Sequence, residues 1–450
     1  MPLRDAPPFS QSGTKALPDL WWTELNDEAL NAHISYALNN NFSLASTWQR
    51  LKAARAVARR QSSGLYPDLD LVAGAAYQEG DTIEGDNDDN ESYTFGPEAT
   101  YEVDLWGRIR SRAQAEALRA QATQEEYRTA ALSLSADIAL TWINLVETQN
   151  QLYLLDRQIE TNEKVLEVLR AQFGAGQVRS QDILRQQLLI EAIREDAIAF
   201  EADMHTLEHQ LAVLRGDAPQ SRNYNPGKKL PALPARPQMG LPAELIQRRP
   251  DVRRAYLDIR AADRDLAAAI RNQYPRLDLT ASYLTDADTA GNLLSNWITT
   301  LAASLVAPVL DGGQRRAEID RTQAVRAQLI NTYGQTVLEA FRDVEDALIQ
   351  EDKQRRRIAN LEGRLAIARD TYDQIRTGYF NGANAFIAVL EALDELQQIE
   401  RDLLRAQRDL IAFRIALYRA LAGGFVTPRE MPETEDAQTI KTNDEESEIE

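Results

Sequence analysis

The stretch from Arg108 to Phe173 constrains this chain most, because it runs for 66 residues without a glycine or a proline. Its residues are mainly Ala, Leu, Gln, Glu and Arg, which favour helix. At about 1.5 Å per residue such a helix would be on the order of 100 Å long, several times the width of an ordinary domain core. It therefore cannot be buried inside one globule.

The partner of this helix follows it directly in the sequence. Apolar residues recur every seven positions along its second half, the pattern for packing along another helix: Ile138, Leu145, Leu152, Ile159, Leu166 and Phe173. After a break at Gly174, Ala175 and Gly176 come 39 more residues without glycine or proline. We therefore predict an antiparallel helical hairpin, with helices at about 107–173 and 177–215.

Two segments before the long helix alternate in polarity with a period of two. Residues 67–78 and 93–105 place apolar side chains on one face and polar or small ones on the other, as β-strands do. The loop between them is rich in carboxylates and is expected to be solvated. Aromatic residues lie toward the strand ends, as membrane interfaces require: Tyr77, Tyr93, Tyr101, Trp106, Tyr283 and Trp297. Ordinary core packing is the alternative reading of these aromatics.

The same order of elements recurs about 208 residues later, where Tyr274-Pro275 repeats Tyr66-Pro67. We predict a first repeat at 27–216 that opens with helix at about 27–64, where a second helix runs from roughly Leu44 to Ser62, and a second repeat at 243–424. The second repeat has expected strands at about 275–285 and 297–310 and helices at about 250–273, 313–377 and 383–422. The expected flanking parts are an extended segment at 1–26, a proline-rich strap at 217–242 that cannot be helical, and an acidic disordered tail at 425–450.

Four strands of this length can cross a bilayer but cannot close into a barrel, so several copies must share one. No run of eighteen apolar residues occurs, and we expect no transmembrane helix. The net charge of −19 argues against nucleic acid as a partner, and the absence of cysteine excludes disulfides and zinc–thiolate sites. His205 and His209 have metal-like spacing, but we expect them on a solvated helix face. No set of catalytic groups or cofactor ligands emerges, and we expect neither an enzyme nor a cofactor.

Several motifs together resemble the TolC-like outer-membrane factors of the NodT and OprM type, which serve resistance-nodulation-division efflux pumps. They are Trp21-Trp22 with Asp27 and Leu30, Leu310-Asp311-Gly312-Gly313, Tyr379-Phe380-Asn381-Gly382 and Leu390-Glu391-Ala392. The resemblance implies an α + β membrane protein of the Gram-negative outer membrane, with most of its mass in the periplasm. It implies a homotrimer with one 12-stranded β-barrel, continued by an α-helical periplasmic barrel.

The resemblance also implies a function and partners. The trimer would be the exit duct of a tripartite multidrug efflux pump, passively conducting drugs and small solutes, in contact with outer-membrane lipid. Its partners would be a periplasmic adaptor, or membrane fusion protein, and an inner-membrane resistance-nodulation-division pump. Two features depart from the type. Glu391 replaces its aspartate, and the sequence has neither a signal peptide nor a cysteine to carry lipid, so we expect a processed form.

The hairpin tips are the candidate functional sites. We predict that Asp182 and Glu391 form acidic rings near the axis, with Ile387 as an apolar constriction and with Arg376 and Arg179 holding the closed state through ion pairs. Solvated hairpin residues are the simpler alternative. The small tip residues would let an adaptor approach closely: Gly174, Ala175, Gly176, Asn381, Gly382, Ala383 and Asn384.

A soluble coiled-coil scaffold or interaction protein is the second hypothesis for the whole chain. It would explain the long helices, but it has no need for two strand hairpins with one apolar face of membrane-crossing length. A requirement for detergent and a trimeric mass would distinguish the duct from the scaffold.

Overall fold

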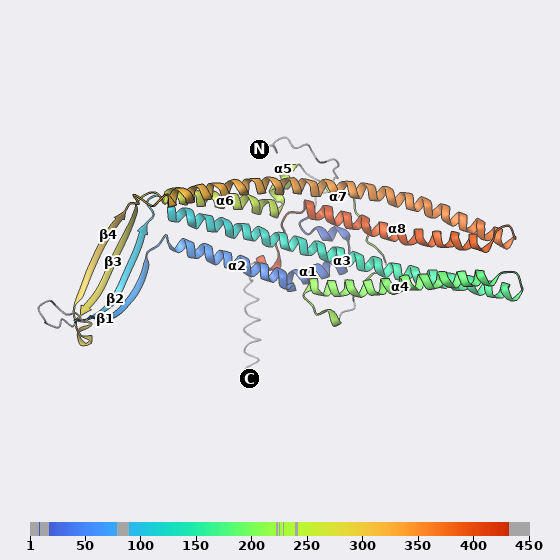
Figure 1. Ribbon diagram of the computed structural model, residues 1–450, viewed down its shortest axis with the longest axis horizontal. Helices are drawn as coiled ribbons and strands as arrows, with labels where there is room; N and C mark the ends of the chain where they lie inside the picture. The colour runs from blue at the N-terminus through green and yellow to red at the C-terminus, as the bar shows by residue number, and fades with distance from the viewer. Residues whose placement is uncertain are drawn as a thin grey trace. The chain divides into compact units, whose positions relative to one another are not determined.

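The computed structural model describes residues 9, 18–78, 90–221, 224, 226–227, 229–238 and 242–431. It is mostly helical, with one four-stranded sheet (Figure 1). Its contacts divide it into two compact units, one of which comprises Gln49–Glu126 and Asp251–Thr336. The other comprises Met1–Trp48, Tyr127–Pro250 and Val337–Glu450. Each unit therefore draws on both sequence repeats, and neither repeat is a compact unit by itself.

The sheet belongs to the first of these units. Its strands are β1 (Asp68–Gln78), β2 (Asn90–Val103), β3 (Arg276–Ala287) and β4 (Trp297–Val306), in the order β1-β2-β3-β4 with every pair antiparallel. The last strand ends before the position near 310 that the sequence predicted. The predicted acidic loop lies mostly outside the described residues.

The register sorts the two faces of the sheet by polarity. Paired residues project to the same face, and neighbouring rows project to opposite faces. One row crosses all four strands with apolar side chains: Leu69, Ala99, Ala281 and Leu301. The adjacent row is polar: Asp70, Glu98, Ser282 and Thr300. The alternation seen in each strand separately is thus in phase across the whole sheet.

An aspartate that follows each strand hairpin caps the start of the next long helix. In α3 (Arg108–Gly174), the carboxylate of Asp104 accepts hydrogen bonds from the backbone nitrogens of Ile109 and Arg110, both at 2.9 Å. In α7 (Gln314–Phe380), Asp311 accepts from the nitrogens of Gly313 at 3.0 Å and Arg315 at 3.3 Å. These bonds satisfy N–H groups that a helix start leaves open.

Ion pairs connect neighbouring helices in the sheet-bearing unit. Here α2 (Phe42–Ser63) and α6 (Pro250–Arg271) lie with the first parts of α3 and α7. The pairs run from α2 to α3, from α3 to α6 and from α6 to α7: Arg50–Glu126 at 2.8 Å, Arg253–Glu125 at 2.9 Å, Arg119–Asp265 and Arg326–Asp263. Partly exposed pairs contribute little stability singly, but they show which helices lie next to each other.

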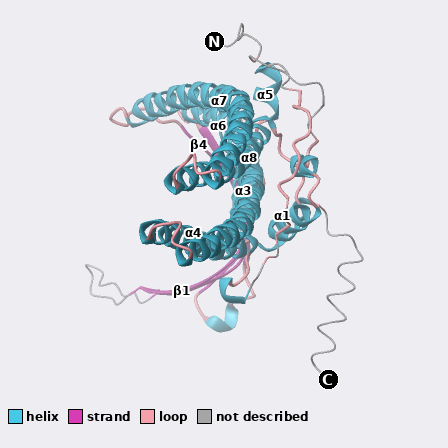
Figure 2. Ribbon diagram, turned by 90° about the vertical axis from the view of Figure 1, so that its right-hand side faces the viewer, coloured by secondary structure: helices cyan, strands magenta, loops and turns pink. Residues whose placement is uncertain are grey.

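The other unit holds two helical hairpins. The later part of α3 pairs with α4 (Ser180–Arg215), the later part of α7 pairs with α8 (Phe386–Leu421), and the hairpins run beside each other (Figure 1, Figure 2). Buried polar side chains hydrogen-bond from α3 of one hairpin to α8 of the other: Gln151, Gln158, Asn162, Gln397 and Arg401. The joint between the hairpins is thus partly polar, whereas the predicted heptad seams concern the packing of each long helix with its own return helix.

The helical region predicted at about 27–64 consists of two helices, the second of which begins near the predicted Leu44. The first is α1 (Glu28–Asn40), capped by Asp27, whose carboxylate accepts from the nitrogen of Leu30 at 3.0 Å. The chain then breaks at Asn41, which accepts from the nitrogen of Leu44 at 2.8 Å and donates to the carbonyl of Leu214 at 2.8 Å. The side chain of Asn41 therefore both starts α2 and ties it to the end of α4.

Three expectations for the flanking parts are corrected by local contacts. The N-terminal segment forms a 3-10 helix at Trp21–Leu25, and both of its tryptophans are buried. The strap contains a short 3-10 helix at Pro219–Ser221, and α5 follows it at Pro242–Arg248. Part of the expected disordered tail forms a 3-10 helix at Pro428–Glu430, where Glu430 pairs with Arg128 at 3.1 Å. The rest of the predicted tail lies outside the described residues.

One 18-residue window in α3 is apolar enough, by length and composition, to cross a membrane, and 67% of it is buried inside the fold. No such segment was expected from the sequence, because only unbroken apolar runs were counted. A mostly buried core helix passes the same composition test, and the buried residues Ile138, Ile143 and Leu145 belong to such a core.

Candidate functional site

The two hairpin tips are formed by short glycine-containing turns. In the first, α3 ends at Gly174 and Gly176 has a φ of 70°; in the second, α7 ends at Phe380 and Gly382 has a φ of 74°. Glycine adopts this left-handed conformation without strain. The predicted docking residues are all exposed: Gly174, Ala175, Gly176, Asn381, Gly382, Ala383 and Asn384. They leave the tip backbone accessible.

The second tip is tighter than the sequence predicted. A helix end at 377 and a break beginning at Gly378 were expected, but α7 continues through Gly378 to Phe380. The amide of Asn384 folds back against Gly378 and donates to the carbonyl of Ile375 at 3.1 Å. A Cβ atom on Gly378 would lie 2.2 Å from that amide nitrogen. Gly378 is therefore needed for this close approach and does not end the helix.

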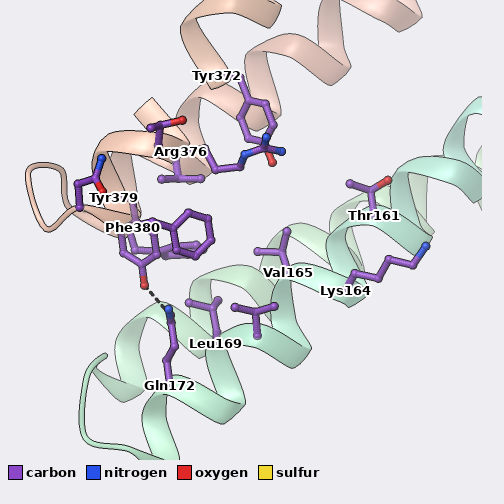
Figure 3. Close-up of a pocket in the computed structure, with 14 residues that line it drawn as sticks. Thr161, Lys164, Val165, Leu169, Gln172, Tyr372, Arg376, Tyr379 and Phe380 are labelled. Carbon is purple, nitrogen blue, oxygen red and sulfur yellow. Dashed lines mark hydrogen bonds between the residues drawn. The ribbon is translucent and has the colours of Figure 1, made fainter. Parts of the chain in front are cut away.

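A hydrogen bond links the two tips directly. The hydroxyl of Tyr379, on α7, donates to Oε1 of Gln172, on α3, at 2.7 Å (Figure 3). The ring of Tyr379 packs edge-on against Phe386, with 5.8 Å between ring centroids. Phe386 in turn belongs to a buried apolar cluster with Leu169 and Val389. The tips are thus joined by one hydrogen bond above an apolar contact.

A polar pocket of about 760 Å³ lies between α4 and the second tip, and it brings together three predicted gate residues: Arg179, Asp182 and Ile387. Asp182 lies in the first turn of α4, and its carboxylate accepts from the backbone nitrogen of Arg179 at 3.4 Å. Tyr379 also lines this pocket, and its pKa is raised by burial and by the negative charge of Asp182. Asp182 and the tyrosine hydroxyl therefore share one electrostatic environment.

The other two predicted gate residues lie elsewhere. Arg376 lines a second pocket, of about 530 Å³, which also uses Gln172, Tyr379 and Phe386 (Figure 3). It pairs with Asp373 on its own helix at 3.3 Å, and not with the other candidate carboxylates within the chain. Glu391 is exposed on α8 and lines neither pocket. Within one chain, the structure therefore groups only part of the predicted gate.

Gln172 and the role of Tyr379 were not predicted from the sequence. The tyrosine was noticed only as part of a tip motif, and its aromatic position beside a glycine turn was the available signal. Nothing marked Gln172, because exposed glutamines are common on helices and its partner lies 207 residues away. The contact is visible only once the two hairpins are placed together.

The predicted interface aromatics fall into two groups at opposite ends of the sheet. Tyr77, Tyr93, Tyr283 and Trp297 lie toward one end, where Tyr283 and Trp297 stack with centroids 4.6 Å apart. Tyr101 and Trp106 lie at the other end. There the indole nitrogen of Trp106 donates to the carbonyl of Pro275 at 2.6 Å.

Metal binding finds no support in the described part of the chain, where no group of three or more His, Cys, Asp or Glu side chains could hold an ion. His205 and His209 are both exposed on α4. His205 contacts Glu208 at 2.9 Å, one turn along the same helix. The pair of imidazoles thus lies on a solvated face.

Comparison with known proteins identifies the family. The model of the family described as "Outer membrane efflux protein" matches residues 33–217 and 241–423. The chain is 28% identical over 422 residues to the pyoverdine export outer membrane protein OpmQ of Pseudomonas aeruginosa, covering 91% of this chain and 88% of that protein. It is 28% identical to the solvent efflux pump outer membrane protein SrpC of Pseudomonas putida, covering 89% and 86%.

A solved structure shares the fold. The outer-membrane channel OprN superposes with a TM-score of 0.87 at 24% sequence identity, covering 93% of this chain and 98% of the channel. The family expected from the sequence motifs is thereby confirmed. The chain belongs to the outer membrane efflux protein family, whose members are efflux channels of the outer membrane.

Proposed function

We propose that three copies of this chain form the outer-membrane exit duct of a tripartite efflux system, passively conducting drugs and other small solutes to the exterior. The observation that carries the proposal is the sheet, which has one continuous apolar face and two open edges. Leu69, Leu301 and Leu305 on that face are at least two-thirds exposed in the single chain. Such a surface needs an apolar environment.

The open edges favour closure by neighbouring chains. In the described sheet, β1 and β4 each have a partner on one side only. Each unpaired backbone group in a bilayer costs several kcal/mol, and a closed barrel removes that cost. The strands contain 11, 14, 12 and 10 residues, close to the length of about 9–11 residues that a tilted strand needs to cross a membrane. Three chains would supply twelve strands.

The size and conductance of the purified protein test the duct directly. We expect a trimeric mass in detergent and discrete conductance steps when the trimer is added to a planar lipid bilayer. The polar face, with Glu98 and Thr300, would line the aqueous pore. A stable monomer that stays soluble without detergent would refute the proposal and support the coiled-coil scaffold.

A duct need not recognise the solutes that it conducts, so their selection would depend on a partner. One relative is named for pyoverdine export and another for solvent efflux, two chemically unlike cargoes on one architecture. Selection would therefore fall to an inner-membrane pump of the resistance-nodulation-division type. A periplasmic adaptor would dock at the exposed tips, where a Cβ atom added to Gly176 or Gly382 would meet no atom within 4 Å. Co-purification of the trimer with its adaptor, lost on Ala383→Trp at the exposed tip but kept on Gly363→Trp, would support this arrangement.

The gate would combine charge with the contact between tips. Asp182 and Ile387 share the polar pocket with Tyr379, and the hydroxyl of Tyr379 holds α7 against α3. Replacing Tyr379 by phenylalanine should loosen the tip and raise the open fraction of channels in the bilayer. Tyr372→Phe, on the same helix, is the matched control, because its ring rather than its hydroxyl contacts Arg376.

Glu391 tests the acidic ring separately. Three exposed carboxylates near the axis would favour cations, so Glu391→Lys should shift the ion selectivity of the channel toward anions. Glu362→Lys, an exposed position on α7 away from the tip, is the control. Unchanged selectivity in the Glu391 variant would remove this residue from the gate.

A further inference from the structure

The second tip pocket has a chemistry that the duct does not explain. Its volume of about 530 Å³ lies within the range of small-molecule sites. Its walls are apolar on both hairpins, with Val165, Val168 and Leu169 from α3 and Phe386 and Val389 from α8. A hydrophobic ring of one or two fused cycles would fit such walls.

The charges at this pocket have one sign. Among the residues that line it, only Lys164 and Arg376 are charged, and both are cationic, although the whole chain carries a net charge of −19. Figure 3 shows these two side chains on opposite walls, Lys164 from α3 and Arg376 from α7. An acidic protein that gathers only cations at an apolar pocket offers a complementary field to an anion.

The present partners of these cations are weak competitors. Lys164 pairs with Glu160 at 2.7 Å and Arg376 pairs with Asp373 at 3.3 Å, each within one helix. All four side chains are about half exposed or more. Exposed pairs of this kind contribute little, because water screens them. Neither carboxylate lines the pocket. Arg376 also lies over the ring of Tyr372, 5.4 Å from its centroid, an exposed contact that is likewise weak. Both cations can therefore turn toward a bound anion at small cost.

We propose that this pocket binds a small aromatic anion, with its ring between the exposed side chains of Val168 and Phe380 and its carboxylate or sulfonate near Lys164 and Arg376. The ligand would contact α3 on one side and α7 and α8 on the other. It would add to the link that Tyr379 and Gln172 already make between the tips. By linkage, a ligand that binds only the joined arrangement stabilises it. This consequence for the gate rests on the proposed duct, whereas the binding itself does not.

Calorimetric titration of the full-length protein in detergent with 2-naphthoate tests the binding. We expect saturable binding of one naphthoate per chain, and weaker binding of the matched cation 2-naphthylmethylammonium. The joint variant Lys164→Gln/Arg376→Gln should weaken naphthoate binding by about tenfold or more, because it removes both charge-assisted contacts. Arg170→Gln is the control, since Arg170 is exposed on α3 but does not line the pocket.

A second variant separates loss of the site from loss of the fold. Val168 is 47% exposed, so Val168→Trp can fill the pocket without disturbing the core, and it should abolish binding while the melting temperature is kept. Equal naphthoate binding by all variants would refute the binding site and indicate that naphthoate partitions into the detergent. If uncharged 2-naphthalenemethanol binds as tightly as naphthoate, the proposed preference for an anion is refuted, and the pocket is an apolar surface suited to a neighbouring helix.

The gate consequence has its own readout. Naphthoate should lower the open fraction of the wild-type channel in a bilayer and should leave the Val168→Trp channel unchanged. Saturable binding with no effect on a conducting channel would refute the coupling between pocket and gate. A protein that binds naphthoate but never conducts would refute the duct and leave the binding site standing.

Discussion

Glu351 is completely buried on α7 and is surrounded by arginines from three parts of the chain. Arg414 on α8 donates to both of its oxygens, at 2.8 and 2.9 Å, Arg236 of the strap donates at 3.0 Å, and Arg355 donates at 3.0 Å. Burial alone would raise the pKa of Glu351, but these hydrogen bonds and positive charges hold it at about 2. One carboxylate thus ties the strap to α7 and α8.

Replacing Glu351 by glutamine should destabilise the protein strongly. The substitution leaves Arg414 buried without a counter-charge, and breaking such a buried pair costs about 3–5 kcal/mol. Thermal unfolding in detergent should show a clear fall in melting temperature. Glu362→Gln, on the exposed side of the same helix, should change little. An unaltered melting temperature for the Glu351 variant would mean that the cluster does not hold the strap.

His33 gives the protein a pH response in a milder range. Burial and the nearby Arg215 lower the pKa of His33 from 6.5 to about 4, although the negative charge of Asp27 raises it in part. The unfolded chain therefore binds a proton below pH 6.5 that the folded chain excludes until pH falls to about 4. The contribution of His33 to stability is consequently constant above pH 6.5 and declines as pH falls from 6.5 to 4.

The difference between wild type and His33→Asn isolates this response from the carboxylates. The melting temperature of the wild type should fall more steeply than that of the variant between pH 6.5 and pH 4, and in parallel with it above pH 6.5. His209→Asn should follow the wild-type profile, because His209 is exposed. Identical slopes for all three proteins would show that folding does not lower the pKa of His33.

Single residues were the least predictable level from the sequence. Asp182 and Glu391 stood out by their position near a turn, but their neighbours depend on how two hairpins meet. The bond between Tyr379 and Gln172 and the pair between Glu351 and Arg414 join different helices. Such contacts follow from packing angles and side-chain rotamers that no local pattern encodes.

At the scale of elements, local signals were strong. The absence of glycine and proline predicted the long helix that the structure places at Arg108–Gly174, and alternation predicted strands whose observed bounds differ by a few residues. Two of the observed boundaries have specific causes. Gly378 remains helical because Asn384 folds onto it, and α1 is separated from α2 because Asn41 caps the second helix. Side-chain bonds to the backbone decided these boundaries.

Gly96 is the position at which β2 most needs glycine. Its φ is 148°, and a Cβ atom there would lie 2.1 Å from the carbonyl oxygen of Tyr283 on β3. Gly96→Ala should therefore disrupt the pairing of β2 with β3 and reduce the yield of trimer in detergent. Gly291→Ala, in the connection between β3 and β4 where a Cβ atom meets nothing within 4 Å, is the matched control. Equal yields would show that the strands can part at no cost.

Substitutions on the two faces of the sheet test which face contacts lipid in the whole molecule. Leu301 belongs to the apolar row of the sheet and is 79% exposed, whereas the adjacent Ala302 projects to the polar face with Thr280. An arginine on the lipid face of a barrel costs about 2–4 kcal/mol near the bilayer midplane. Leu301→Arg should therefore lower the fraction of chains that assemble in lipid vesicles, and Ala302→Arg should lower it much less. The reverse order would place the apolar face inside.

The arrangement of whole chains could be predicted only in outline. The sequence indicated that four strands need neighbours, because no four-stranded sheet closes on itself. It could not indicate the compact units, in which Gln49–Glu126 and Asp251–Thr336 combine halves of both repeats. That combination depends on contacts between helices distant in sequence, such as the pair of Arg119 with Asp265.

The two half-paired edge strands also have a genetic consequence. If the β1 and β4 edges of each of three chains must pair to close the proposed barrel, one chain with a defective edge prevents closure of the barrel that it joins. In a cell that makes sound and faulty chains in equal amounts, only about one barrel in eight would be free of faulty chains. A defect confined to either edge would therefore be dominant, whereas complete loss of one gene copy would merely halve the supply.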